Sequence, residues 1–271
     1  MPELPEVETS RRGIEPHLKG EIIRLLLVRQ PRLRWPVPAD LPDRIKGHRI
    51  LSVRRRAKYL LLDTTAGSVI LHLGMSGSLC LVDKNDPAGK HDHLDFIFQN
   101  GTALRFTDPR RFGAVLWGGS NPLAHPLLSR LGPEPLSADL TTAYLHRKCR
   151  GRRVSIKQLI MQSSIIAGIG NIYACEALFR AGILPSRPAA SLSLAHHETL
   201  ISAIHGVLGE AIAQGGTTLR DFLGADGKPG YFKQKLQVYG RGGMPCINCD
   251  KPLKEVRMGQ RSTVFCENCQ R

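Results

Sequence analysis

The fold of the C-terminal end is decided by residues 246–269, which read CINCDKPLKEVRMGQRSTVFCENC. This segment opens and closes with a Cys-x2-Cys pair: Cys246 and Cys249, then Cys266 and Cys269. Two such pairs on either side of a hairpin-length segment are typical of a four-thiolate zinc site. The spacing therefore predicts one Zn²⁺ that closes a β-hairpin, with Arg261 at or near the hairpin tip. Four protein ligands leave no open coordination position, so we expect the metal to be structural.

The N-terminal half shows a different pattern. Short apolar runs, separated by turns rich in Gly and Pro, extend from about residue 21 to residue 118; the clearest are 22–28, 59–62, 69–73, 94–98 and 114–117. Several short strands with turn signals between them predict a β-sandwich. A flanking helix is expected before the strands because Val7, Ile14 and Leu18 recur at helical spacing. We therefore predict an N-terminal β-sandwich domain over residues 1–131.

The character of the chain changes at the Leu-Gly-Pro-Glu-Pro stretch of residues 131–135, which predicts a linker over 132–137. A helical domain is expected over 138–230, and its clearest apolar stripe covers 193–213. Further helices are expected at about 139–149, 155–163 and 171–181. With the zinc hairpin placed at 237–271, the predicted fold class is α+β with two domains.

The net charge of the chain indicates what kind of molecule it binds. The 271 residues contain 38 Lys and Arg against 23 Asp and Glu, a formal net charge of +15. Such a surplus repels itself unless a polyanion neutralises it, and nucleic acid is the usual polyanion. The chain has no apolar run of membrane-spanning length, and its acidic start is unlike a signal peptide. We therefore expect a cytoplasmic protein that binds nucleic acid; a membrane surface is a weaker alternative, because no long basic amphipathic helix stands out.

The N-terminus offers a candidate nucleophile. Removal of Met1 would give Pro2 a free secondary amine beside the carboxylate of Glu3. An α-amino group has a pKa of about 7.7–8.0, against about 10.4 for lysine, so a usable fraction is unprotonated near neutral pH. Such an amine can attack an electrophilic carbon and form an iminium. The alternative interpretation is that Pro2 only begins a helix.

A basic cluster runs from Arg44 to Lys58, with seven Lys or Arg and no acid. If this stretch is a strand, Arg54, Arg56 and Lys58 project from one face. The alternative is a solvated edge strand whose charges prevent aggregation. That alternative fits Lys58 least well, because Lys58 adjoins the apolar run of residues 59–62.

Two loop segments suggest a wedge. Met75 lies between glycines in HLGMSG, and Arg110 and Phe112 lie two residues apart in TDPRRFG. An apolar or aromatic side chain beside an arginine can fill the gap left by an extruded base. The alternative is that Met75 is an ordinary core residue.

Seven motifs occur in one order: MPELPEVET, RRAKY, HLGMSG, TDPRRFG, GIGNIY, GGTTL and the zinc tail. Together they closely resemble the bacterial formamidopyrimidine-DNA glycosylase family over essentially the whole chain. The resemblance implies an N-terminal β-sandwich and a helical C-terminal domain with a helix-two-turn-helix and a zinc-finger hairpin. It also implies that a loop over residues 217–230 covers the flipped base.

The resemblance carries over residue by residue. The implied catalytic residues are Pro2 as nucleophile, Glu3 as the acid near the sugar ring, Lys58 beside the damaged nucleotide, and Arg261 of the zinc hairpin. The implied DNA contacts are His91 on the sandwich side and Arg152, Lys157 and Asn171 on the helical side. Met75, Arg110 and Phe112 match the side chains that fill the hole left by the flipped base.

The implied activity is a bifunctional one. A glycosylase of this kind removes oxidised purines such as 8-oxoguanine from duplex DNA, and its lyase activity cuts the strand by β,δ-elimination through a Pro2 Schiff base. Endonuclease VIII, which acts on oxidised pyrimidines, is a second candidate, although its start usually has Gly where this chain has Leu4. A non-catalytic zinc-ribbon DNA-binding protein is a third. The expected partner is damaged double-stranded DNA, and a monomer is expected.

Overall fold

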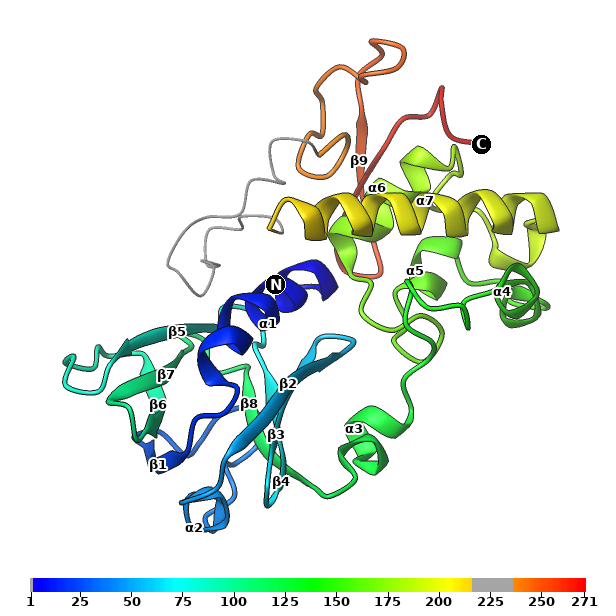
Figure 1. The fold of residues 1–271 in the computed structure, drawn as a ribbon. Coiled ribbons are helices and arrows are strands. Elements are labelled where there is room, and N and C mark those ends of the chain that lie inside the picture. The colour runs from blue at the N-terminus through cyan, green and yellow to red at the C-terminus, as the bar shows by residue number, and fades with distance from the viewer. Residues whose placement is uncertain (1, 216–235) are drawn as a thin grey trace. The chain divides into compact units, whose positions relative to one another are not determined.

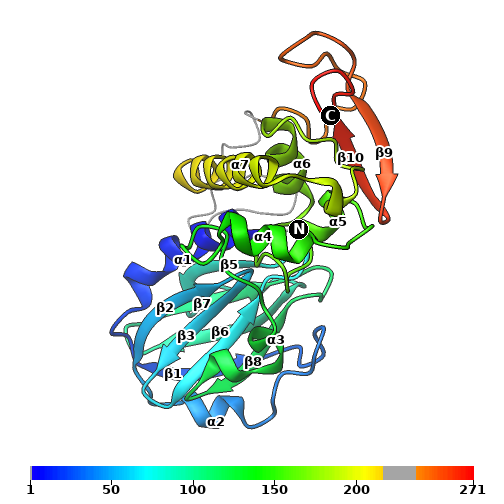
Figure 2. The same ribbon diagram turned by 90° about the vertical axis from the view of Figure 1, so that its right-hand side faces the viewer.

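The computed structural model describes residues 2–215 and 236–271, and the chain divides into two compact units between Arg130 and Leu131 (Figures 1 and 2). The N-terminal unit contains the β-sheets, and the C-terminal unit contains most of the helices and the Cys-rich hairpin. The predicted α+β class is confirmed. The expected base-covering loop over 217–230 lies outside the described residues. Within the described part of the chain, no helix combines the length and apolarity that a membrane span requires.

The N-terminal unit is built from two four-stranded antiparallel sheets, ordered β1-β6-β7-β5 and β2-β3-β4-β8. The strands are β1 (Ile23–Val28), β2 (Ile50–Arg56), β3 (Tyr59–Thr64), β4 (Gly67–His72), β5 (Ser78–Asp83), β6 (Asp92–Phe98), β7 (Thr102–Thr107) and β8 (Ala114–Gly119). The short helices are α2 (Leu41–Ile45), a 3₁₀ turn (Pro122–Ala124) and α3 (Pro126–Ser129). Side chains from both sheets meet in one apolar core, which is the packing that defines a sandwich.

All five apolar runs found in the sequence are strands. Three further strands, β2, β5 and β7, carry a weaker apolar signal. Of these, β2 and β5 lie at sheet edges, where side chains are partly exposed and polar residues are tolerated.

Helix α1 (Leu4–Leu18) is the predicted flanking helix. Its fully buried residues Val7, Ile14 and Leu18 join the sandwich core, as their helical spacing predicted. The helix packs mainly against β2. Its first residues are therefore fixed to the sandwich, which matters because the candidate nucleophile lies directly before them.

The C-terminal unit contains α4 (Thr142–Cys149), α5 (Ile156–Ile160), α6 (Asn171–Arg180), a 3₁₀ turn (Ala189–Ser191) and α7 (Leu194–Ala213). All four helices expected here are present, and α7 begins one residue inside the expected range. Helix α6 packs on α7 and also on the zinc hairpin. Cys175 and Phe179 of α6 share a core with Val264 and two of the zinc cysteines. The hairpin is therefore packed into this unit.

The hairpin consists of β9 (Lys254–Met258) and β10 (Arg261–Phe265). The two turn residues, Gly259 and Gln260, have φ of +56° and +60°. Two successive positive φ values belong to a type I′ turn, whose twist matches that of the strands. Arg261 pairs with Met258 at the turn and is exposed, so it lies beside the hairpin tip as expected.

Candidate active site

Pro2 and Glu3 lie directly before α1, and both are buried; Glu3 is 2% exposed. Glu3 is the N-cap residue, and its backbone N–H donates to Oε2 of Glu6 at 2.8 Å. Glu6 is fully buried, so this half of a capping box fixes the direction in which the chain enters the helix. The helix start thus positions the two residues that the N-terminal chemistry needs.

Lys58 occupies the two-residue turn that joins β2 to β3, between the paired residues Arg56 and Tyr59. The first turn residue, Ala57, has φ of +53°, as a primed hairpin turn requires. The expectation that Lys58 shares a strand face with Arg54 and Arg56 was therefore wrong. The strand ends at Arg56 because the chain reverses there, and Lys58 is the second residue of the turn.

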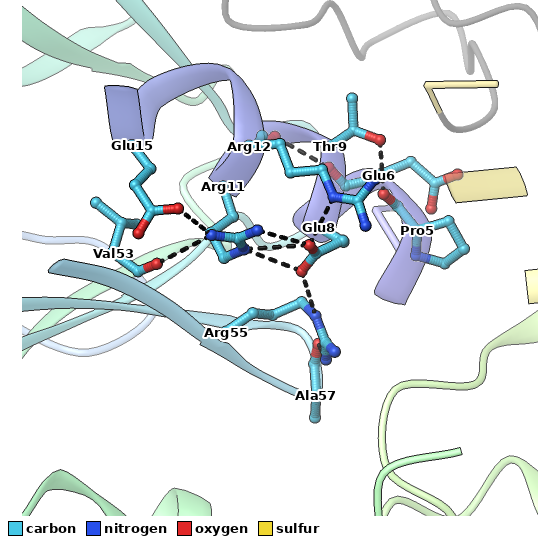
Figure 3. A network of polar contacts seen from close by, with 11 residues as sticks. Pro5, Glu6, Glu8, Thr9, Arg11, Arg12, Glu15, Val53, Arg55 and Ala57 are labelled. Carbon is cyan, nitrogen blue, oxygen red and sulfur yellow. Dashed lines mark hydrogen bonds and ion pairs between the residues drawn. The ribbon is translucent and has the colours of Figure 1, made fainter. Parts of the chain in front are cut away.

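A partly buried ion-pair network ties this turn to α1 (Figure 3). Arg55 donates through Nε to Oε2 of Glu8 at 3.1 Å and through Nη1 to the carbonyl of Ala57 at 3.0 Å. Glu8 also accepts hydrogen bonds from Arg11 and Arg12. Burial raises the pKa of the Glu8 carboxyl, but these arginine hydrogen bonds outweigh burial and lower the pKa below its usual value. An ionised Glu8 therefore anchors the Lys58 turn to the helix that begins with the candidate nucleophile.

Arginines of the basic cluster also form ion pairs within the sandwich. Arg54 makes a two-pronged ion pair with Asp63 of the neighbouring strand, at 2.5 and 2.8 Å. Strand β2 is an edge of its sheet. A solvated edge strand thus describes Arg54, whose side chain is 48% exposed, but not Arg55, whose side chain is 13% exposed and paired with Glu8.

His72, at the end of β4, lies near Lys58 and was not among the residues that the sequence pointed to. Its ring lies 4.8 Å from the ring of Tyr59, and its Nδ1 accepts the backbone N–H of Gly74 at 3.0 Å. Burial, reinforced by the positive charges of Lys58 and Arg34, lowers the pKa of His72 to about 4. The imidazole is therefore neutral at pH 7, with its proton on Nε2. Its position in the HLGMSG motif was the available signal.

The two wedge loops lie together in the N-terminal unit. Met75 follows β4 and is half-buried, whereas Arg110 and Phe112 lie between β7 and β8 and are exposed. The Arg110 guanidinium lies 5.0 Å from the Phe112 ring centroid, within cation–π range. The carbonyl of His91 accepts a hydrogen bond from the backbone N–H of Asp108 at 3.0 Å. The predicted DNA contact His91 therefore lies beside the start of the loop that carries Arg110 and Phe112.

In the C-terminal unit, Lys157 is 1% exposed. Its ammonium donates to Asn171 Oδ1 at 2.6 Å, Thr263 Oγ1 at 2.6 Å and the Ser262 carbonyl at 3.2 Å. Asn171 in turn donates to the Ser262 carbonyl at 2.8 Å. Lys157 thus joins α5, the first residue of α6 and β10. The sequence predicted that Lys157 touches DNA; here its ammonium is directed at protein groups.

Arg152 is exposed in the turn before α5. Arg261 is exposed beside the hairpin turn, next to Ser262, to which Lys157 and Asn171 are bound. The C-terminal unit therefore presents cationic side chains on a support that is itself fixed by hydrogen bonds. Such groups suit a phosphate backbone.

The four cysteines of the tail form one cluster, with all sulfur atoms within 4.8 Å of one another. Cys246 and Cys269 have sulfurs 3.9 Å apart, and Cys249 and Cys266 have sulfurs 3.5 Å apart. A tetrahedral site with Zn–S bonds of about 2.3 Å has S···S edges of about 3.8 Å. The cluster therefore fits one structural zinc. Cys149 and Cys175 are buried core residues, whereas Cys80 is partly exposed on edge strand β5.

Family models match nearly the whole chain. The formamidopyrimidine-DNA glycosylase N-terminal domain matches residues 1–115, its H2TH domain matches 131–222, and a zinc finger found in FPG and IleRS matches 243–271. The chain belongs to the formamidopyrimidine-DNA glycosylase family. It is thus a DNA glycosylase of base-excision repair that acts on damaged DNA, with the lyase activity typical of this family.

Similar proteins match this chain over nearly the full length of both chains. The formamidopyrimidine-DNA glycosylase of Stutzerimonas stutzeri is 58% identical over 271 residues and all of both chains. The MutM (Fpg) protein of Thermus thermophilus has a TM-score of 0.90 at 38% identity, covering 99% of this chain and 98% of that one. A Lactococcus lactis Fpg mutant in complex with Fapy-dG-containing DNA has a TM-score of 0.93 at 32% identity, covering 99% of each chain. The match to the glycosylase family models sets aside the interpretation as a non-catalytic zinc-ribbon protein.

Proposed function

We propose that Pro2 is the nucleophile of this glycosylase and that Glu3 assists opening of the deoxyribose ring. After removal of Met1, the Pro2 nitrogen attacks the anomeric carbon, and the bond to the damaged base breaks with its electron pair leaving on the base. The base takes up the proton that the Pro2 nitrogen releases. Glu3 protonates the ring oxygen as the sugar opens, and the iminium forms on Pro2. The observation that carries this proposal is the buried Pro2–Glu3 pair at the start of a helix fixed to the sandwich.

The iminium then drives strand cleavage. It acidifies the C–H next to the former anomeric carbon, so loss of that proton expels the 3′ phosphate by β-elimination. A second elimination expels the 5′ phosphate, and water releases Pro2. An iminium of a secondary amine is already a cation, which makes it a strong electron sink.

Cationic and polar groups are proposed to hold the phosphates next to the lesion. Lys58 is suited to this role because its turn is anchored to α1 through Arg55. Arg261, Arg152 and Asn171 are proposed to hold DNA from the C-terminal unit, and His91 from the sandwich. Such contacts position the duplex without reading its sequence, and they weaken with salt.

Met75, Arg110 and Phe112 are proposed to enter the duplex where the damaged base leaves the stack. Extrusion costs a few kcal/mol of unstacking and unpairing, and a wedge that fills the vacated space offsets part of that cost. We propose oxidised purines, 8-oxoguanine and formamidopyrimidines, as the substrates, and the nucleoid in the cytoplasm as the place of action.

Borohydride trapping tests the nucleophile. Wild-type protein incubated with a duplex containing 8-oxoguanine opposite cytosine should yield a covalent protein–DNA adduct at Pro2 and a doubly cleaved strand. Blocking the N-terminal nitrogen should abolish both. Pro2→Gly keeps a primary amine and should retain only part of the adduct. An undiminished adduct after blocking would assign the chemistry to a lysine instead.

The same duplex with thymine glycol in place of 8-oxoguanine tests the substrate class. We expect faster base release from the 8-oxoguanine duplex under single-turnover conditions. The reverse order would favour the endonuclease VIII specificity.

A further inference from the structure

One buried carboxylate bridges the two loops that carry the proposed wedge. Asp108 is fully buried, and its Oδ1 accepts the hydroxyl of Ser76 at 2.7 Å. Its Oδ2 accepts the backbone N–H of Gly113 at 2.7 Å. Ser76 follows Met75 in the first loop, whereas Gly113 follows Phe112 in the second. A single side chain therefore holds the residues next to two of the three wedge side chains.

The third wedge residue is held by the same groups. The backbone N–H of Arg110 lies 3.2 Å from Ser76 Oγ and 3.3 Å from Asp108 Oδ1, so the two oxygens share this donor. Asp108 is itself fixed to β6, since its carbonyl hydrogen-bonds to Nε2 of the buried His93 at 2.7 Å. The bridge thus has a rigid support in the sheet.

The two loops also touch backbone to backbone. Gly74 has φ of +63°, and a Cβ placed on it would lie 2.4 Å from the carbonyl carbon of Phe112 and 2.5 Å from the nitrogen of Gly113. A Cβ on Gly113 would lie 2.8 Å from the carbonyl oxygen of His72. The two loops are therefore packed closely at their backbones, and the hydrogen bonds of the Asp108 carboxylate oppose their separation.

We propose that Asp108, with Ser76, is a positioning pair that makes Met75, Arg110 and Phe112 one rigid insert. This inference rests on the wedge role proposed above. Asp108 accepts hydrogen bonds from Ser76, Arg110 and Gly113, and a buried donor that loses its acceptor costs the full desolvation penalty. Two loops that move independently would lose conformational entropy when they enter the duplex, whereas loops that are already held together lose less. Asp108 touches no substrate in this role.

The test separates a step that needs the wedge from one that does not. Base release from an 8-oxoguanine:cytosine duplex requires extrusion, whereas borohydride trapping on single-stranded DNA with a ready-made abasic site requires none. Asp108→Ala removes the bridge, and Ser76→Ala removes only its first arm. Ser78→Ala, which deletes a hydroxyl at the start of β5, is the matched control. A 2-aminopurine beside the lesion reports unstacking directly.

We expect Ser76→Ala to slow base release by about tenfold, the ratio that corresponds to about 1.4 kcal/mol, and Asp108→Ala to slow it further. Single-strand trapping by both variants should stay close to wild type, and the 2-aminopurine signal should slow along with base release. Ser78→Ala should behave as wild type in every assay.

Wild-type duplex rates in both Asp108→Ala and Ser76→Ala would overturn the proposal. So would an equal loss in the duplex and single-strand assays, because that result indicates general damage to the active site. If Asp108→Ala does not fold, Ser76→Ala decides between these outcomes. Failure of the wild-type protein to release the base or form the adduct would instead refute the proposed function.

Discussion

Replacing Lys157 with methionine would test whether a buried ammonium holds together the part of the C-terminal unit that is proposed to bind DNA. Lys157 is 1% exposed and donates three hydrogen bonds, to Asn171, Ser262 and Thr263. Methionine has a similar length and volume, so it removes the charge and the donors without leaving a large cavity. The change therefore isolates the polar interactions.

The expected cost follows from the acceptors that remain. The Ser262 carbonyl keeps its hydrogen bond from the Asn171 amide at 2.8 Å, so it stays satisfied. Thr263 Oγ1, which is fully buried, and Asn171 Oδ1 both lose their short hydrogen bond. The buried Thr263 acceptor should cost about 1–3 kcal/mol when it is left unsatisfied, and the half-buried Asn171 acceptor about 1 kcal/mol, so the variant should lose roughly 2–4 kcal/mol of stability. For a unit of this size that loss lowers the Tm by roughly 5–15 °C.

Differential scanning calorimetry and a DNA-binding titration on the zinc-loaded protein would measure both consequences. Lys254→Met is the control, because Lys254 is also a lysine of this unit but is half-exposed and paired with Glu267 on the surface. Its loss should change stability by no more than about 0.5 kcal/mol. We expect Lys157→Met to weaken DNA binding as well, since Asn171 loses its support. If the two variants had equal unfolding free energies and equal affinities, Lys157 would not hold this region together.

Three further predictions concern the sandwich and the zinc site. The pKa of His72 is about 4 in the folded protein and about 6.5 in the unfolded chain, so folding favours its neutral form. The contribution of His72 to the free energy of unfolding should therefore be complete above pH 6.5. It should fall by up to about 3 kcal/mol as the pH is lowered to 4. Denaturant titrations at pH 7 and pH 4.5 should show a smaller loss for His72→Gln than for wild type, and equal losses would contradict this. Chelation of zinc, or Cys249→Ser, should abolish DNA binding while circular dichroism still reports a folded sandwich; full affinity without metal would refute the structural role of the site. Gly74→Ala should destabilise the sandwich more than Gly20→Ala. Both glycines have positive φ, but only at Gly74 would the new Cβ lie within 3 Å of other backbone atoms. Equal losses of about 1 kcal/mol in chemical denaturation would mean that only the backbone strain at positive φ matters.

Much of the fold follows from short-range patterns. The helical spacing of Val7, Ile14 and Leu18 predicted α1, and the long apolar stripe predicted α7 almost to the residue. The cysteine spacing predicted a cluster that the structure contains, with the hairpin turn beside Arg261. Each of these features depends on residues within a few turns of one another, so the local sequence contains the whole signal.

The arrangement of the candidate site required contacts between distant residues. Arg55 reaches Glu8 across 47 positions, Ser76 reaches Asp108 across 32, and Lys157 reaches Thr263 across 106. No periodicity or spacing rule joins such partners. The prediction that Lys58 continues a strand was wrong for the same reason, since the pairing of Arg56 with Tyr59 decides where the strand ends.

The sequence by itself determined the family, the basic character, the zinc ligands and the N-terminal Pro2–Glu3 pair, because these depend on residue identity and local order. Only the tertiary structure decided which charged groups are buried against protein partners and which stay exposed. Burial places Lys157 and Glu8 where an unpaired charge is costly, so their ionic groups bind protein partners, whereas Arg110 and Arg261 remain exposed. That division follows from desolvation, and desolvation depends on the packed fold.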